Sequence, residues 1–137
     1  MKALLTYLFD SLSSVATTSY SVYSERAPED AAFPYITFRL SNSFAVEDRE
    51  DYLLDVDVWD NVQKSTDPTR IDTLTRRIEG NGNRAAPTGL DGRRYYATGY
   101  PAVRLYKEAK AMLPDPDEAI QRRHIRFRAI VFDATSS

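Results

Sequence analysis

The residues best suited to chemistry lie near the C-terminal end, in the segment QRRHIRFRAIVFD (residues 121–133). It contains four arginines and the only histidine of the chain, interleaved with apolar side chains. Guanidinium groups bind phosphates or carboxylates, and a histidine can transfer protons in catalysis. The segment therefore suggests three roles: contact with nucleic acid, an active site, or a charged sheet face that meets other protein.

A two-residue period accounts for the interleaving, because successive side chains of a strand point to opposite faces of a sheet. The apolar set is Ile125, Phe127, Ala129 and Val131, and the polar set is His124, Arg126 and Arg128. General-base catalysis by His124 would need an orienting carboxylate and a nucleophile, and neither is visible at a recognisable spacing. The pattern favours a charged sheet face, with nucleic-acid contact as the alternative.

A second strand pattern, YLLDVDVWD (residues 52–60), supplies carboxylates for such a face. Leu54, Val56 and Val58 form its apolar side, so Asp55 and Asp57 point outward beside Trp59. Opposite charges on neighbouring strands stabilise a sheet by roughly 0.2–1 kcal/mol. We expect Arg126 and Arg128 to meet carboxylates, either Asp55 and Asp57 or those of an adjacent subunit. These residues and Trp59 are the candidate sheet-face or subunit contacts.

All five glycines of the chain lie between residues 80 and 99, which predicts a long, mobile loop or insertion at about 80–101. Its start, GNGNRA, matches a loose dinucleotide-binding pattern, but it closes a helix instead of leaving a strand. Tyr95, Tyr96 and Tyr100 in this loop are candidate interface anchors, with base stacking as the alternative.

No cofactor or metal is expected from the remaining residues. The carboxylates of PDPDE (residues 114–118) lack the ligand order of a calcium loop, so a solvated turn is the better interpretation. The absence of cysteine excludes disulfides and thiolate chemistry. A net charge of -2 argues against sequence-independent DNA binding, which depends on clustered cations.

The order of the elements predicts one α+β domain over residues 1–137. An amphipathic helix is expected in MKALLTYLFDSLSS, and a second one from Asp67, its N-cap, and Pro68 to a stop at Gly80. The buried stripe of the second helix is expected to be Ile71, Leu74 and Ile78. Strands are expected over residues 20–24, which alternate loosely, in PYITFRL, in YLLDVDVWD, over residues 103–111 in strict alternation, and over residues 125–131. The predicted fold is a largely antiparallel sheet of about four to five strands with two helices packed on it.

In order along the chain, the N-terminal helix, FPYITFRL, YLLDVDVWD, DPTRIDTLTRRIEG and RRHIRFRAIVF resemble the tail-completion, or tail-to-head joining, family of long-tailed bacteriophages and phage-derived particles. The resemblance implies a structural virion protein without catalytic activity. It would form a homo-oligomeric ring, commonly a hexamer, at the head–tail junction after synthesis in the bacterial cytoplasm. Its partners would be the tail tube protein and the head connector or adaptor, with DNA only passing through the lumen.

Two other functions are consistent with the residues. One is a small nucleic-acid-binding module that uses the C-terminal arginine strand, and the other is an accessory subunit of a host complex. The acidic pI of about 5.4 weakens the nucleic-acid interpretation.

Overall fold

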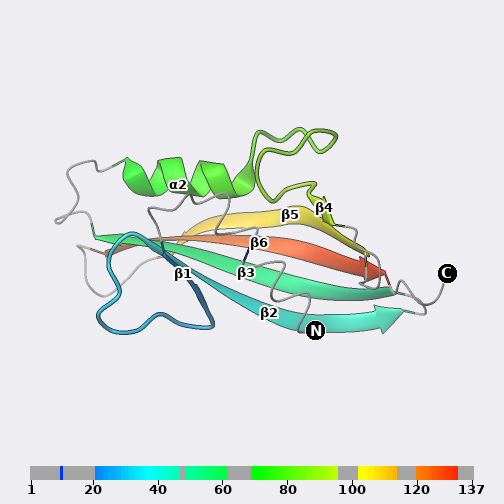
Figure 1. Ribbon diagram of the computed structural model, residues 1–137, viewed down its shortest axis with the longest axis horizontal. Helices are drawn as coiled ribbons and strands as arrows, with labels where there is room; N and C mark the ends of the chain where they lie inside the picture. The colour runs from blue at the N-terminus through cyan, green and yellow to red at the C-terminus, as the bar shows by residue number, and fades with distance from the viewer. Residues whose placement is uncertain are drawn as a thin grey trace.

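A six-stranded sheet with one helix on its face forms the body of the molecule (Figure 1). The computed structural model describes residue 10 and residues 21–46, 49–61, 69–95, 102–113 and 120–132. The strand order is β1-β2-β3-β6-β5-β4; all neighbours are antiparallel except β1 and β2, which are parallel. The elements are β1 (Ser21–Ser24), β2 (Tyr35–Val46), β3 (Arg49–Asn61), α2 (Arg70–Glu79), β4 (Arg94–Tyr95), β5 (Ala102–Leu113) and β6 (Ile120–Phe132).

The predicted fold class is wrong in its balance of helix and strand. Within the described residues a single helix, α2, packs on the sheet, and most of these residues are strand. Strand β1 corresponds to the loosely alternating residues 20–24. Strand β4 was not predicted, because a two-residue strand is too short to show a periodicity. The predicted N-terminal helix lies outside the described residues except for Asp10, which is helical.

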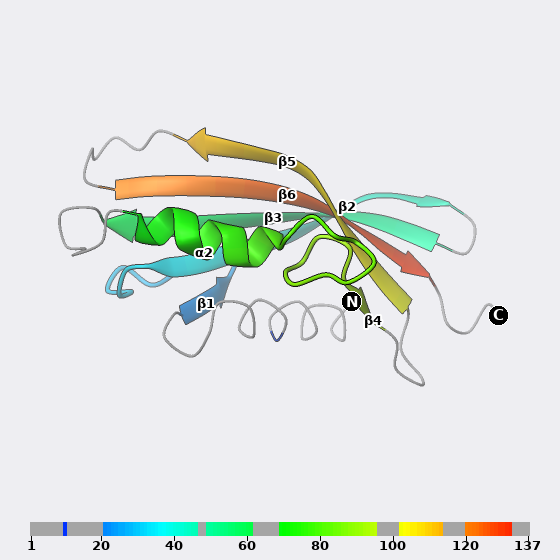
Figure 2. The same ribbon diagram turned by 90° about the horizontal axis from the view of Figure 1, so that it is seen from above.

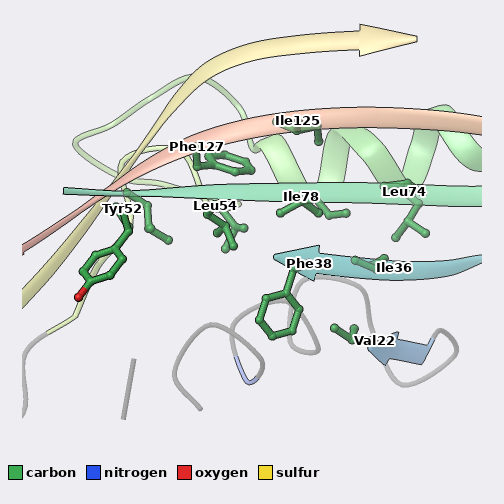
Figure 3. Close-up of a cluster of buried hydrophobic side chains, with 14 of the residues drawn as sticks. Val22, Ile36, Phe38, Tyr52, Leu54, Leu74, Ile78, Ile125 and Phe127 are labelled. Carbon is green, nitrogen blue, oxygen red and sulfur yellow. The ribbon is translucent and has the colours of Figure 1, made fainter. Parts of the chain in front are cut away.

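The core lies between α2 and one face of the sheet, and the predicted alternation of β2, β3 and β6 is confirmed. Ile36, Leu54, Val56, Val58, Ile125, Phe127 and Ala129 are fully buried, and Phe38 is nearly so. Figure 3 shows these strands and α2 contributing side chains to one cluster. Burying an aliphatic side chain stabilises the fold by roughly 1.5–3 kcal/mol, so this cluster is the main source of stability.

Strand β5 departs from the expected alternation at a β-bulge. Val103 and Leu105 are buried as predicted, but the pairing with β6 shifts between Lys107 and Ala109. A bulge inserts one extra residue, here Glu108, and so reverses the side-chain alternation beyond it. Lys107 and Lys110 therefore both reach Glu79 of α2, at 3.0 and 2.8 Å from its carboxylate oxygens. Strict alternation over residues 103–111 predicted Lys110 on the face opposite Lys107, and the bulge makes that prediction wrong.

Helix α2 packs through the predicted stripe, since Ile71, Leu74 and Ile78 are all buried. The helix begins at Arg70 with Thr69 as its N-cap, whereas the expected cap Asp67 and Pro68 lie outside the described residues. It ends as predicted at Gly80, whose φ of 96° requires the conformational freedom of glycine.

Ion pairs connect both ends of α2 to the sheet. At the N-terminal end, Arg70 donates two hydrogen bonds of 3.0 and 2.6 Å to the carboxylate of Asp60, which is only 1 % exposed. Asp72 accepts from Arg123 of β6 at 3.2 Å. At the C-terminal end, Glu79 accepts from the two lysines of β5.

Within the described residues, no helix has the length and apolar character needed to cross a bilayer.

The loop after α2 returns along the outer edge of β5 (Figure 2). Leu90 is completely buried in the core, and the backbone amide of Gly92 donates to Leu105 at 2.7 Å. The carboxylate of Asp91 accepts from the backbone of Lys107 at 2.9 Å and from Arg84 at 3.1 Å. Residues 89–93, expected as part of a mobile connection, are thus packed against the helix and the sheet, whereas residues 81–86 are exposed.

Replacing Gly89 by alanine should destabilise the protein by about 1–3 kcal/mol, as expected for overpacking. A Cβ at Gly89 would overlap the backbone nitrogen of Gly80 and lie 2.6 Å from the Ile78 oxygen and 2.7 Å from the Arg77 oxygen. These backbone atoms belong to the C-terminal end of α2, so they cannot move apart from the added Cβ without moving the end of the helix. Urea denaturation of the Gly89→Ala variant measures the loss.

Gly82→Ala is the matched control. An added Cβ there has no atom within 4 Å, although the φ of 78° disfavours alanine. Its expected cost is only the backbone term of about 1 kcal/mol. Equal losses at the two positions would show that the close approach of Gly80 and Gly89 does not constrain the loop.

The Glu79 ion pairs should make stability depend on pH. Burial raises the pKa of Glu79, but hydrogen bonds from Lys110 and Lys107 outweigh it and lower the pKa below the ordinary 4.5. A carboxyl whose pKa is lowered on folding adds stability above its unfolded pKa and loses it as the pH falls through the folded pKa. The difference in unfolding free energy between wild type and Glu79→Gln should therefore be largest above pH 4.5 and shrink below it.

Chemical denaturation between pH 3 and pH 7 measures this difference, with Lys110→Met as the companion variant. Loss of one of its two donors should leave Glu79 with a weaker pH dependence. A difference between wild type and Glu79→Gln that stays constant over this range would contradict the assignment.

Candidate functional site

The candidate site is the sheet face opposite α2, called here the outer face. It is formed by Thr37 and Arg39 of β2, Asp55, Asp57 and Trp59 of β3, and Arg122, His124, Arg126 and Arg128 of β6. The β3–β6 register places Asp55 opposite Arg126, Asp57 opposite His124, and Trp59 opposite Arg122. The structure thus brings together the two predicted aspartates, the predicted tryptophan and the polar side of the C-terminal strand.

The two aspartates are the centre of a continuous ion-pair network. Asp57 accepts two hydrogen bonds of 3.1 Å from Arg122, through Nε to Oδ1 and the terminal nitrogen to Oδ2. Asp55 Oδ1 accepts from Arg126 Nε at 2.8 Å. This hydrogen bond and the negative charge of Asp55 raise the pKa of Arg126 above its ordinary value. The expected pairing of Arg126 with an aspartate of the same chain is confirmed.

His124 lies between the two aspartates and uses both ring nitrogens. Its Nδ1 is 2.9 Å from Asp57 Oδ1, and its Nε2 is 3.2 Å from Asp55 Oδ1. An imidazolium with a proton on each nitrogen donates to both carboxylates in this geometry. General-base catalysis needs a ring nitrogen that can reach a substrate proton, and this arrangement directs both nitrogens to carboxylates.

Arg128 has a different partner from the one expected. Its Nε lies 2.6 Å from Oε1 of Glu108, the bulged residue of β5, and not against Asp55 or Asp57. Strict alternation from Leu105 places this glutamate on the outer face together with Tyr106, which pairs with Arg128. The proposed Arg128–aspartate pairing is therefore wrong, although the prediction that Arg128 meets a carboxylate is correct.

An aromatic cluster borders the ion-pair network at the end where β1 joins the sheet. Tyr35 stacks on Trp59 with ring centroids 6.0 Å apart, and the rings of Tyr23 and Phe33 also contact Tyr35. The Arg122 guanidinium lies over the Trp59 ring at 4.6 Å from its centroid. The indole nitrogen donates to Thr37 Oγ1 at 3.1 Å, so Trp59 is held by stacking, a cation–π contact and a hydrogen bond.

A groove of about 410 Å³ lies over this face. Its floor includes Tyr35, Trp59, Asp55 and Asp57, and its wall is the segment Glu25–Ala27 that follows β1. Glu25 and Arg39 on the rim form a long ion pair of 3.8 Å between largely exposed side chains. Among the described residues, no group of His, Asp and Glu side chains is arranged to hold a metal ion.

Of the three candidate tyrosines of the Gly-rich loop, only Tyr95 lies within the described residues. Tyr95 lies in β4, paired with Val103 of β5, while Tyr96 and Tyr100 lie outside the described residues. Their role as interface anchors stays a prediction.

Sequence reasoning missed Arg122, Glu108 and Tyr35 as members of the site. Arg122 and Tyr35 could have been found, because strict alternation from His124 and from Thr37 places both on the outer face. Glu108 could also have been found, because alternation from Leu105 places it on the outer face, although no sequence signal indicates the bulge itself.

Comparison with known proteins shows a shared fold. A chain of a solved structure described as "Virion of native gene transfer agent (GTA) particle" superimposes with a TM-score of 0.50 and 14 % sequence identity, covering 88 % of this chain and 84 % of that chain. No protein-family model matches the sequence. No curated protein matches it either.

The Arg126–Asp55 pair should tolerate reversal only when both charges are exchanged. Arg126→Glu places like charges opposite each other and should cost roughly 1 kcal/mol, because the arginine side chain is 44 % exposed and the pair is screened by solvent. Adding Asp55→Arg should recover part of this loss. Denaturation of the two single variants and the double variant measures the coupling.

Arg128→Glu is the matched control, because its partner is Glu108. Asp55→Arg should not rescue Arg128→Glu, whereas Glu108→Arg should. Rescue of both arginine variants by Asp55→Arg would contradict the pairing described for the outer face.

Proposed function

We propose that this chain is a structural subunit of a tailed phage or phage-derived particle, where it forms a ring that completes the tail and joins it to the head connector. The ring would be a homo-oligomer, most simply a hexamer, at the head–tail junction of the virion. Its neighbours would be the tail tube protein and the connector or adaptor protein. The subunit would be made in the cytoplasm of the bacterial host.

The observation that carries this proposal is the shared fold with a chain of a gene transfer agent virion over most of both chains. At 14 % identity the likeness concerns the fold, and function does not follow from fold alone. The proposal therefore also uses the sequence resemblance to tail-completion proteins, which rests on the order of five segments along the chain. The two lines of support are independent, because one compares backbones and the other compares residue patterns.

The outer face supports a role in protein assembly over one in binding nucleic acid. Arg122, Arg126 and Arg128 each have a carboxylate partner within the chain. A guanidinium that already donates to a carboxylate must lose that contact to bind a phosphate, which weakens the gain from releasing counterions. Such a face would let DNA pass through a ring without holding it. The arginine strand thus loses the feature that favoured a nucleic-acid-binding module.

We propose no catalytic activity and no cofactor for the chain. The only histidine donates or accepts at both ring nitrogens within the ion-pair network, and the two central aspartates accept from arginine. These contacts favour a structural role for the charged residues.

Deletion of the gene from the genome that encodes the particle tests the function. Loss of the subunit should leave DNA-filled heads and unattached tails, because the surfaces that the ring joins would not meet. Electron microscopy of lysates measures the fraction of joined particles, and expression of the wild-type gene in trans should restore it. Normal numbers of joined particles after deletion would refute the proposal.

A further inference from the structure

Two arginines of α2 differ from every other charged residue of the helix. Arg70, Asp72 and Glu79 each pair with a residue of the sheet. Arg76 and Arg77 are exposed, and neither forms an ion pair with any described residue. Three of the five charged residues therefore fasten the helix, and the remaining two are available to another molecule.

A hollow of about 440 Å³ lies beside these two arginines. It is lined by Thr73, Arg76, Arg77 and Gly80 on the side of the helix and by Asn81 and Thr88 of the following loop. Guanidinium groups and hydroxyls are donors that suit carboxylates, and Arg binds them in a bidentate manner. The chemistry of the hollow fits an acidic side chain.

The complementary charge lies on the opposite side of the same molecule. The loop between β1 and β2, ERAPEDAAFP (residues 25–34), has three acidic residues and one arginine. Glu29 and Asp30 are exposed and form no ion pair with the described part of the chain. Figure 1 shows this loop on the other side of the sheet from α2, and its first residues form the wall of the outer-face groove.

We propose that α2 of one copy docks on the loop 25–34 of the next copy, with Arg76 and Arg77 meeting Glu29 and Asp30. The arginine surface of α2 and the acidic loop lie on opposite faces of the sheet, so each copy can contact one neighbour through the arginines and another through the loop. Contacts of this heterologous kind propagate from copy to copy and close into a ring when the rotation permits. The inference rests on the proposed ring and names the side chains that would hold neighbouring subunits in it.

A second copy fits these observations better than a nucleic acid. The chain carries a net charge of -2, so its long-range field does not attract a polyanion. Two free arginines make a small phosphate-binding surface, since duplex binding commonly uses many more cations. The acidic loop supplies a matching partner for both arginines within the same sequence.

Charge reversal on each surface tests the inference. Arg76→Glu/Arg77→Glu and Glu29→Arg/Asp30→Arg should each raise the concentration needed for assembly by roughly tenfold or more, because both place like charges across the contact. An equal mixture of the two variants should assemble at the wild-type concentration, since each helix then faces a loop of opposite charge. Mass photometry and analytical ultracentrifugation measure the assembled fraction.

Arg94→Glu is the matched control, because Arg94 is exposed and forms no ion pair with the described residues. Arg94→Glu changes the net charge by the same amount as the single variant Arg76→Glu or Arg77→Glu. Unlike those variants, it should leave assembly unchanged. Circular dichroism and thermal unfolding of all variants establish that each remains folded. Arg76→Gln/Arg77→Gln should give a smaller defect, since it removes the attraction without adding repulsion.

The outcomes separate the inference from the proposed function. If the wild type assembles and both reversed variants assemble equally well, the docking surfaces are wrong while the ring proposal stands. If Arg76→Glu/Arg77→Glu assembles normally and loses only salt-dependent affinity for a DNA duplex, the patch is a nucleic-acid surface. A wild-type protein that stays monomeric and is absent from the head–tail junction overturns both.

Discussion

The antiparallel pairing of β3 with β6 is the constraint on which the other features depend. These two strands pair along the whole thirteen-residue length of each, at the centre of the sheet. The register places Val56 opposite Ile125 in the core and, at the adjacent pairs, Asp55 opposite Arg126 on the outer face. A shift of either strand by one residue would turn the charged side chains of that strand into the core, where unpaired charges are strongly unfavourable. The hydrophobic core and the ion-pair network therefore specify the same register.

The helix and the loop that follows it depend on this sheet in a different way. Helix α2 buries only a short stripe, and its ends are fixed by Asp60 of β3 and by two lysines of β5. The loop then covers the edge of β5, where Asp91 accepts from the backbone of Lys107. The bulge at Glu108 reverses the alternation of β5 and brings Lys110 back toward α2, where it pairs with Glu79.

Much of the fold could be predicted from the sequence where the side-chain period was long and regular. The alternation in β2, β3 and β6 identified the buried residues, and the stripe Ile71, Leu74 and Ile78 identified α2. The predicted alternation was wrong in the second half of β5, because a bulge cannot be recognised from the order of apolar and polar residues. The two-residue strand β4 was also missed, because it is defined only by its pairing with β5. In the candidate site, Asp55, Asp57, Arg126 and Arg128 were found, but the partner of Arg128 was not, although alternation in β5 places Glu108 on the same face.

The two edges of the sheet share one feature: a long strand is bordered by a much shorter one. Strand β1 pairs with only the first four residues of the twelve-residue β2, and β4 pairs with two residues of the twelve-residue β5. Exposed strand edges can recruit strands from other molecules through backbone hydrogen bonds, which carry little sequence information and lead to aggregation. Short border strands interrupt the long, straight template that such recruitment requires. Contacts with other molecules are thereby left to side chains, whose charges can distinguish a correct partner from an incorrect one.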